Sequence, residues 1–181
     1  NVYKSNDYMV LDLFTRVNLE LTKTIRSSNK KGSLLQVIDS TSTPMGARML
    51  RKFIEQPLMN VDLINRRLDI TEAILSDFNL RENLRESLER IYDLERICAK
   101  VAYDKVNPKD LINLKNSIAK LPEIVTTIAN SNSPVLDKFK SSIDCLYDIY
   151  RLIDESILEE PSQGLKDGNI IKSQYSKDLY E

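Results

Sequence analysis

The stretch IDSTSTPMGARMLRKFIEQPL, from Ile38 to Leu58, is the most informative part of this 181-residue chain because its residue types mark the start of a helix. The Thr43 side chain can accept a hydrogen bond from a free backbone N–H, and Pro44 has a preset φ and no N–H. A helix is therefore predicted to begin at Pro44 and to end before Pro57. Its apolar residues recur at spacings of three and four and so share one face. They are Met45, Met49, Leu50 and Phe53.

The remaining residues of this predicted helix are mainly charged. Arg48, Arg51, Lys52 and Glu55 lie on its other sides. We interpret Gly46 as a position of close helix contact and Arg48 as a member of a surface ion pair. Both residues are therefore assigned structural roles, and neither is assigned a part in catalysis.

On the N-terminal side, residues 11–25 repeat apolar residues with a period of four, which favours a helix with Asp12 as its cap. The repeated residues are Leu13, Val17, Leu21 and Ile25. Residues 8–11 could alternatively enter as a short strand. Residues 29–32 are predicted to form a turn, and the spacing of Ser33 and Gln36 indicates a capping box that starts a short helix.

On the C-terminal side, the chain shows a series of further helix starts. The predicted caps are Asn60, Asn79, Asp93, Asn107 before Pro108, and Ser133 before Pro134. Pro122 is expected to kink or restart a helix at Leu121. From Pro134 to about Leu158 the apolar spacing predicts one helix of roughly 36 Å, at 1.5 Å per residue.

The final residues change in character. Pro161, Gly164 and Gly168 disfavour helix, and Asp167-Gly168 between Leu165 and residues 169–171 predicts a turn that joins two short extended pieces. Residues 175–181 could begin another helix, capped by Ser176. The fold class predicted from the whole sequence is therefore all-α, a multi-helix bundle with one long helix and a short extended hairpin near its C-terminus.

Composition limits the partners of this chain. Its 26 basic and 27 acidic residues nearly cancel, so any contact with DNA must be local or supplied by another segment. The nearest approach to a basic patch is formed by Lys23, Arg26, Lys30 and Lys31, which we interpret as a solvated loop. No apolar run is long enough to span a bilayer, and no signal peptide is recognisable. The polar first residues, without an initiator Met, favour a piece of a longer protein.

The sequence offers little catalytic chemistry. It contains no histidine, and its four glycines fit neither a P-loop nor a dinucleotide-binding loop. Cys98 and Cys145 stand alone in apolar helical patterns, so we expect small core residues in a reducing cytoplasm. The acidic pairs Asp62 with Asp69 and Glu159 with Glu160 are expected at the surface. We therefore assign no catalytic, cofactor-binding or metal-binding residue, and DNA-binding residues are not identifiable.

Aromatic residues beside a cation could stack on single-stranded bases. Tyr147, Tyr150 and Arg151 are the candidates for such a role. The helical spacing nevertheless places Tyr150 in the core or at its rim. A base-stacking site is therefore not predicted.

Several blocks of the chain, in order, resemble the MutS family of DNA mismatch repair proteins. The most specific block is residues 32–58, and others are YMVLDLFTRVNLEL at 8–21, YDLERICAKV at 92–101 and NPKDLINLKNSIAKLPEI at 107–124. The family pattern matches the block at 32–58 at eight positions, namely Asp39, Thr41, Thr43, Gly46, Arg48, Leu50, Pro57 and Leu58. Phe53 departs from the pattern, because relatives often carry Trp there, but it keeps an aromatic anchor.

This resemblance implies that residues 1–181 are a fragment of the core or lever domain, domain III, ending just before an inserted clamp. It implies a structural role that couples the state of an ATPase domain to DNA clamping and mismatch recognition. No mismatch-reading or nucleotide-binding motif lies in these residues, so the fragment itself is not expected to be an enzyme. ATP and Mg²⁺, mismatched double-stranded DNA, the connector, clamp and ATPase domains, and a dimeric state are implied for the cytoplasmic parent protein.

Other interpretations remain open. One is the second MutS subfamily, which lacks the mismatch-reading domain and acts outside mismatch repair. Another is a free-standing helical adaptor that binds a partner protein, and an enzyme with a carboxylate pocket is a third. For the lever role, we expect the predicted helix from residue 134 to about 158 to act as a rod braced by the helices before it.

Overall fold

The computed structural model describes residues 7–131, 133–162, 164 and 168–175. Within these residues it contains ten α-helices and, instead of a sheet, two isolated antiparallel bridges. The predicted all-α fold class is confirmed. The chain divides into two compact units, residues 1–77 and residues 78–181, which we call unit 1 and unit 2.

Unit 1 contains the first four helices, and each begins where the sequence places a cap. They are α1 (Leu13–Asn18), α2 (Leu34–Ile38), α3 (Pro44–Glu55) and α4 (Val61–Ser76). The side chains of Asp12, Ser33, Thr43 and Asn60 accept hydrogen bonds from N–H groups of the first turns. The capping box at Ser33 is only half formed, because Gln36 Oε1 accepts a bond from the N–H of Gly32 at 2.5 Å.

The helix predicted over residues 11–25 is much shorter in the structure. It ends at Asn18, and Glu20 adopts the left-handed conformation with a φ of 49°. The Glu20 carboxylate accepts a bond from the N–H of Ile25 at 2.7 Å and so holds a turn in place of a further helical turn. Ahead of α1, Tyr8 forms an antiparallel bridge with Leu58, so the alternative of an extended entry is the one observed.

Unit 1 buries few apolar side chains. Leu21 and Leu35 are buried, but many residues expected to face a core are exposed. Those exposed include Leu13, Val17, Ile25, Met49, Phe53, Leu63, Leu68 and Leu75. Amphipathic spacing therefore identified the apolar faces of α1, α3 and α4 correctly, whereas their burial within this chain was a wrong expectation.

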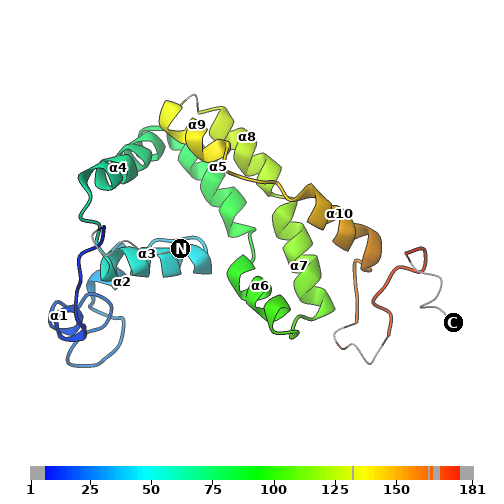
Figure 1. Ribbon diagram of the computed structural model, residues 1–181, viewed down its shortest axis with the longest axis horizontal. Helices are drawn as coiled ribbons and strands as arrows, with labels where there is room; N and C mark the ends of the chain where they lie inside the picture. Colours follow the sequence, from blue (N-terminus) through cyan, green and yellow to red (C-terminus); the bar gives the residue numbers. More distant parts are fainter. Residues whose placement is uncertain (1–6, 132, 163, 165–167, 176–181) are drawn as a thin grey trace. The chain divides into compact units, whose positions relative to one another are not determined.

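Unit 2 contains six helices arranged around α7 and α8. They are α5 (Phe78–Glu89), α6 (Leu94–Ala102), α7 (Pro108–Ile118), α8 (Leu121–Ala129), α9 (Pro134–Lys140) and α10 (Tyr147–Ser156). α6 and α10 both pack against α7, and α5 and α9 both pack against α8 (Figure 1). The predicted starts at Asp93, Asn107 and Leu121 are confirmed. Asn79 is not a cap, because α5 starts at Phe78, directly after Asp77 at the end of α4.

The long helix predicted from residue 134 to about 158 is wrong. α9 ends at Lys140, α10 begins at Tyr147, and Leu146 between them is left-handed with φ 49° and ψ 42°. Short polar side chains account for the break: Ser142 Oγ donates to the carbonyl of Phe139, and Asp144 Oδ1 accepts from the N–H of Leu146. Such local bonds compete with helical ones, so apolar spacing alone does not keep the helix continuous.

The extended segment near the C-terminus is confirmed in part. Ile157 forms an antiparallel bridge with Ile171, and the N–H of Leu158 donates to the carbonyl of Ile170 at 2.8 Å. Asp167 of the predicted turn Asp167-Gly168 lies outside the described residues, as do Leu165 before it and the predicted helix cap Ser176. The pairing of residues 157–158 with residues 170–171 is therefore observed, whereas the turn at Asp167-Gly168 stays a prediction.

The hydrophobic core of unit 2 is assembled from every helix of the unit. Its buried apolar residues are Leu80, Ile91, Ile97, Ile112, Ile118, Ile124, Ile128, Leu136, Ile153 and Ile157. Cys98 was expected in this core but is exposed, because one residue along a helix turns the side chain about 100° away from that of buried Ile97. Cys145 is half-buried, and both cysteines are free thiols.

Two cap positions allow a matched test of this local structure. Asn107 forms a full capping box with Asp110, whereas Ser133 occupies the same position before α9 without a side-chain cap bond. We expect Asn107→Ala to lower the free energy of unfolding by about 1 kcal/mol and Ser133→Ala to lower it by much less. Urea denaturation followed by circular dichroism measures both, and equal losses would contradict the assignment.

Candidate functional site

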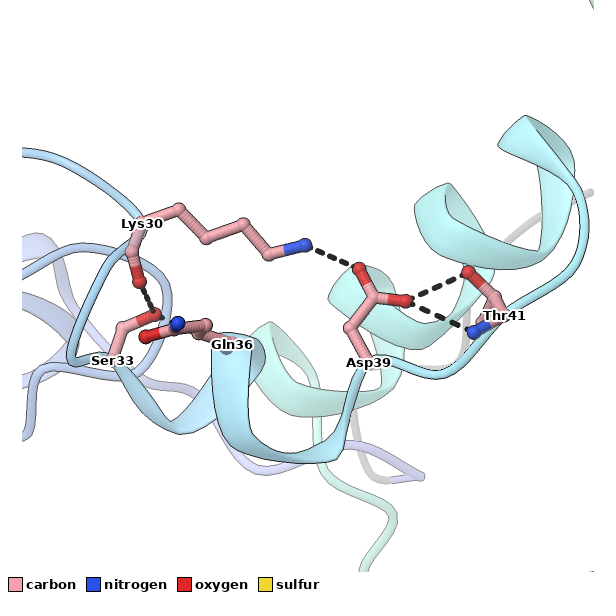
Figure 2. A network of polar contacts seen from close by, with 5 residues as sticks. All are labelled: Lys30, Ser33, Gln36, Asp39 and Thr41. Carbon is pink, nitrogen blue, oxygen red and sulfur yellow. Dashed lines mark hydrogen bonds and ion pairs between the residues drawn. The ribbon is translucent and has the colours of Figure 1, made fainter.

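A polar network connects the loop before α2 to the segment before α3 (Figure 2). The Lys30 ammonium pairs with the Asp39 carboxylate, which also accepts a bond from Thr41 Oγ1 at 2.7 Å. Ser33 Oγ donates to the Lys30 carbonyl at 2.7 Å and accepts from the N–H of Gln36. Asp39 thus fixes the entry to α3 from two sides and joins it to the loop.

The ion pair with Lys30 and the hydrogen bonds from Thr41 lower the pKa of the Asp39 carboxyl. The hydrogen bond from Lys30, followed by the bonds from Thr41, lowers the pKa of the Asp39 carboxyl to about 2. Asp39 is therefore ionised throughout the neutral range. Its contribution to stability is complete above its ordinary pKa of 3.8 and is lost as the pH falls through the lowered value.

Gly46 follows this network in the first turn of α3. A Cβ atom added there would lie 3.1 Å from Thr43 Oγ1, the atom that accepts the Gly46 N–H at 2.9 Å. The close contact is thus with the cap of its own helix, and not with another helix as we expected. Any larger residue would press on the side chain that starts α3.

An apolar cluster joins α7 to α10 in unit 2. Ile112 of α7 forms a core cluster with Ile153 and Ile157, and Leu111, Leu114 and Ile170 pack around it. Burying an isoleucine side chain of this kind stabilises a fold by roughly 1.5–3 kcal/mol. The cluster therefore holds α10 and the bridge after it against α7.

Lys115 adds a polar clamp beside this apolar cluster. Its side chain is only 5% exposed, and its Nζ lies 3.1 Å from Asp154 Oδ1 and 2.5 Å from Glu159 Oε1. Burial of the ammonium opposes its charge, but the bonds to Glu159 and Asp154 outweigh burial and raise the pKa of Lys115. Both carboxylates remain partly exposed, so they anchor the cation without being buried themselves.

Two buried serines connect further elements of unit 2. Ser117 Oγ of α7 accepts a bond from the N–H of Tyr92 at 3.0 Å and donates to the Asn113 carbonyl. Ser87 Oγ of α5 donates to Glu123 Oε1 of α8 at 3.0 Å. Among the described residues, no buried side-chain nitrogen or oxygen lacks a hydrogen-bond partner. These interactions position helices, and they account for the buried polar side chains of this part of the described structure.

Lys115 and Ser117 were not identified from the sequence, although a signal was present. Pro108, Ile112, Lys115 and Ile118 recur at spacings of three and four along the buried face of α7. A lysine buried in register with an apolar stripe requires an anionic partner. The sequence did not reveal that Asp154 and Glu159 would lie opposite, because they are distant along the chain.

The residues considered for chemistry lie mostly at the surface. Asp62, Asp69 and Glu160 are exposed, and Glu159 serves the Lys115 clamp. Tyr147 is exposed, Tyr150 is half-buried at the rim as expected, and Arg151 pairs with Glu155. No group of three His, Cys, Asp or Glu residues suited to a metal ion occurs in the described part of the chain.

Unit 2 has a hollow of about 410 Å³ between α7 and the link from α5 to α6. It is lined by Glu89, Arg90, Ile91, Tyr92, Asn116 and Lys120. Its two cations are already paired, Arg90 with Glu86 and Lys120 with Glu123. None of the described helices is both long enough and apolar enough to cross a membrane.

Comparison with known proteins identifies relatives over the whole chain. The family model described as MutS domain III matches residues 14–179. The chain is 59% identical over 181 residues to DNA mismatch repair protein MutS of Clostridioides difficile (strain 630), covering 100% of this chain and 19% of that protein. It is 52% identical over 181 residues to DNA mismatch repair protein MutS of Alkaliphilus oremlandii (strain OhILAs), covering 100% of this chain and 21% of the relative. The chain thus spans about a fifth of the length of these relatives.

The Asp39 network makes a pH-dependent prediction. Asp39→Asn removes the ion pair with Lys30, so the variant should be less stable than the parent chain at pH 6. The difference should shrink as the pH falls from 4 to 2, because the Asp39 carboxyl of the unfolded parent chain is protonated below its ordinary pKa of 3.8 while that of the folded chain stays ionised down to about pH 2. Urea unfolding across this range measures it. A difference that stays constant, as expected for the exposed control Asp69→Asn, would contradict the role of Asp39.

A substitution that keeps the length of the Lys115 side chain can test its ion pairs with Asp154 and Glu159. Lys115→Met keeps most of the aliphatic packing but removes two charge-assisted bonds, and we expect a loss of about 1–2 kcal/mol after allowing for the partly exposed carboxylates. The control Lys120→Met breaks the exposed pair with Glu123 and should cost less than about 0.5 kcal/mol. Thermal unfolding at pH 7 compares them. Because the pKa of Lys115 is raised, the same loss should persist up to about pH 10.

Proposed function

The chain belongs to the MutS domain III family, and from this membership we propose that it is the core that transmits movement between an ATPase domain and a DNA clamp. It is a helical domain, and it is not the ATPase domain of the relatives. The observation that carries the proposal is the packing of α7 against α6 and α10 by buried residues. Closely packed helices move as a body and change between discrete arrangements.

The break between α9 and α10 changes how transmission would occur. A single rod over residues 134–158 is absent, so movement would pass through helix contacts: from α9 to α8, and from α10 to α7. The Lys115 clamp and the Ile112 cluster are the strongest tie between α7 and α10. We therefore place the mechanical centre of the domain at α7.

The exposed apolar faces of unit 1 support placement inside a larger protein. α3 and α4 present Met49, Phe53, Leu63, Leu68 and Leu75 outside any core of the described residues. Apolar side chains in such number generally lie in an interface. Since the relatives are about five times as long as this chain, we propose that connector, clamp and ATPase domains of the parent cover these faces.

The parent protein would supply the chemistry that domain III lacks. We propose a cytoplasmic, dimeric MutS that binds mismatched double-stranded DNA and uses ATP and Mg²⁺ in its ATPase domain. The repair branch of the family is favoured over the second subfamily because the two relatives reported above are both named DNA mismatch repair protein MutS. Tyr and Arg residues of α10 have no assigned part in this function.

Two neighbouring residues of α10 allow a test of whether movement is transmitted through its contact with α7. Ile153 is 5% exposed in the cluster with α7, whereas Leu152 is 56% exposed on the same helix. In the parent protein, Ile153→Ala should leave ATP hydrolysis without DNA nearly unchanged but reduce the change in hydrolysis rate caused by mismatched DNA. Leu152→Ala is the control and should leave both rates unchanged.

A loss of the response to mismatched DNA must be distinguished from a loss of the folded structure in the Ile153→Ala variant. Circular dichroism must first show that the Ile153→Ala parent is folded, with a stability loss of about 2–5 kcal/mol that reflects a looser contact. An unaltered response to mismatched DNA in that folded, loosened protein would refute transmission through α7 and α10.

A further inference from the structure

The loop between α1 and α2 concentrates positive charge in a chain that is otherwise nearly neutral. Lys23, Arg26, Lys30 and Lys31 lie within nine residues of each other, with no acidic residue among them. The whole chain has a formal net charge of −1. The excess of positive charge is thus a local property of this loop, and composition alone gives no account of it.

The structure shows that the four cations are not equivalent. Lys30 is paired with Asp39, so it belongs to the network that positions α3. Lys23, Arg26 and Lys31 are exposed, and no ion pair engages them within the described ranges of the chain. Three cations therefore remain available to an anionic partner.

The loop is held in shape by its own hydrogen bonds. The N–H of Thr24 donates to the carbonyl of Asn29 at 3.0 Å, and the N–H of Ser28 donates to the carbonyl of Thr24 at 2.9 Å. Thr24 Oγ1 and Ser27 Oγ lie 2.6 Å apart and share a hydrogen bond. The cations consequently project from an ordered turn, which reduces the entropy lost on binding.

Gly32 completes this arrangement. It has a φ of 93°, and a Cβ atom there would lie 3.0 Å from Thr24 Cγ2. A positive φ combined with this contact favours glycine at the position. The turn that presents Lys31 is therefore built tightly against the turn that carries Lys23 and Arg26.

We propose that Lys23, Arg26 and Lys31 form a contact site for the phosphate backbone of duplex DNA. This inference rests on the proposed function, in which the parent protein binds double-stranded DNA. Cations and hydroxyl groups are the side chains that usually contact DNA phosphates, and such contacts carry no base specificity. The loop offers Ser27 and Ser28 as hydroxyl groups beside the cations. An acidic surface of a partner protein is the rival ligand.

The test uses the parent protein without nucleotide and a fluorescein-labelled 30-base-pair duplex without a mismatch. Affinity is measured by anisotropy at several salt concentrations for Lys23→Gln/Lys31→Gln. Each lost phosphate contact should reduce the slope of log affinity against log salt by about 0.9, so we expect a decrease of about 2 and at least about tenfold weaker binding at low salt. Lys105→Gln/Lys109→Gln makes the same charge change elsewhere and serves as the control.

The salt dependence of DNA binding in the two double variants supports or overturns the proposed phosphate site. A lower slope in the loop variant alone supports it, and Arg26→Glu should then weaken binding further. Unchanged affinity, or an equal loss in both double variants, overturns it; unchanged DNA affinity with lost binding to an acidic partner would identify the rival ligand. Circular dichroism checks that the exposed substitutions leave the fold intact. Since no nucleotide is present, failure here leaves the coupling proposal standing, and failure of coupling leaves this site standing.

Discussion

The packing of α7 against its neighbours is the constraint on which unit 2 depends. α7 is the one described helix of this unit that buries a charged side chain along with its apolar face, and it contacts both α6 and α10. Ile112 supplies the apolar contact to Ile153 and Ile157, while Lys115 supplies the polar one. A sliding movement of α10 would break both at once, because a buried ammonium cannot leave its carboxylates cheaply.

Each of the two units is stabilised internally by a different kind of interaction. Unit 2 has a distributed apolar core, whereas unit 1 relies on caps, the bridge between Tyr8 and Leu58, and the network around Asp39. Within unit 1, Arg67 lies over the ring of Phe53, 3.5 Å from its centroid, and so joins α4 to α3. Unit 1 therefore has ordered helices with exposed apolar faces, which is the form expected of a surface covered by other parts of a larger protein.

Helix starts were the part of the fold that the sequence predicted best. A capping side chain and the proline after it act within one turn, so Thr43-Pro44 and Asn107-Pro108 could be recognised without tertiary information. Helix ends and continuity were predicted less well. Glu20 and Leu146 adopt left-handed conformations that neither residue type favours. The local bonds that accompany them, from Ile25 to Glu20 and from Leu146 to Asp144, leave no signal in the apolar spacing.

Burial and side-chain partners could not be obtained from one-dimensional patterns. The spacing of Leu63 and Leu68 identifies an apolar face of α4 but not what covers it. Likewise, Lys115 lies in an apolar register that signals a buried cation with an anionic partner, yet Asp154 and Glu159 are brought to it only by the folding of α10 against α7. Resemblance identified the family to which the domain belongs, while the break after Lys140 was visible only in the structure.

Native-state hydrogen exchange on the parent protein can show whether α7 and α10 open as one body. If α7 is the mechanical centre, the amides of residues 108–118 and 147–156 should open with one common free energy, and nucleotide binding should shift both segments together. Opening of residues 147–156 at a clearly lower free energy, independently of α7, would contradict the account.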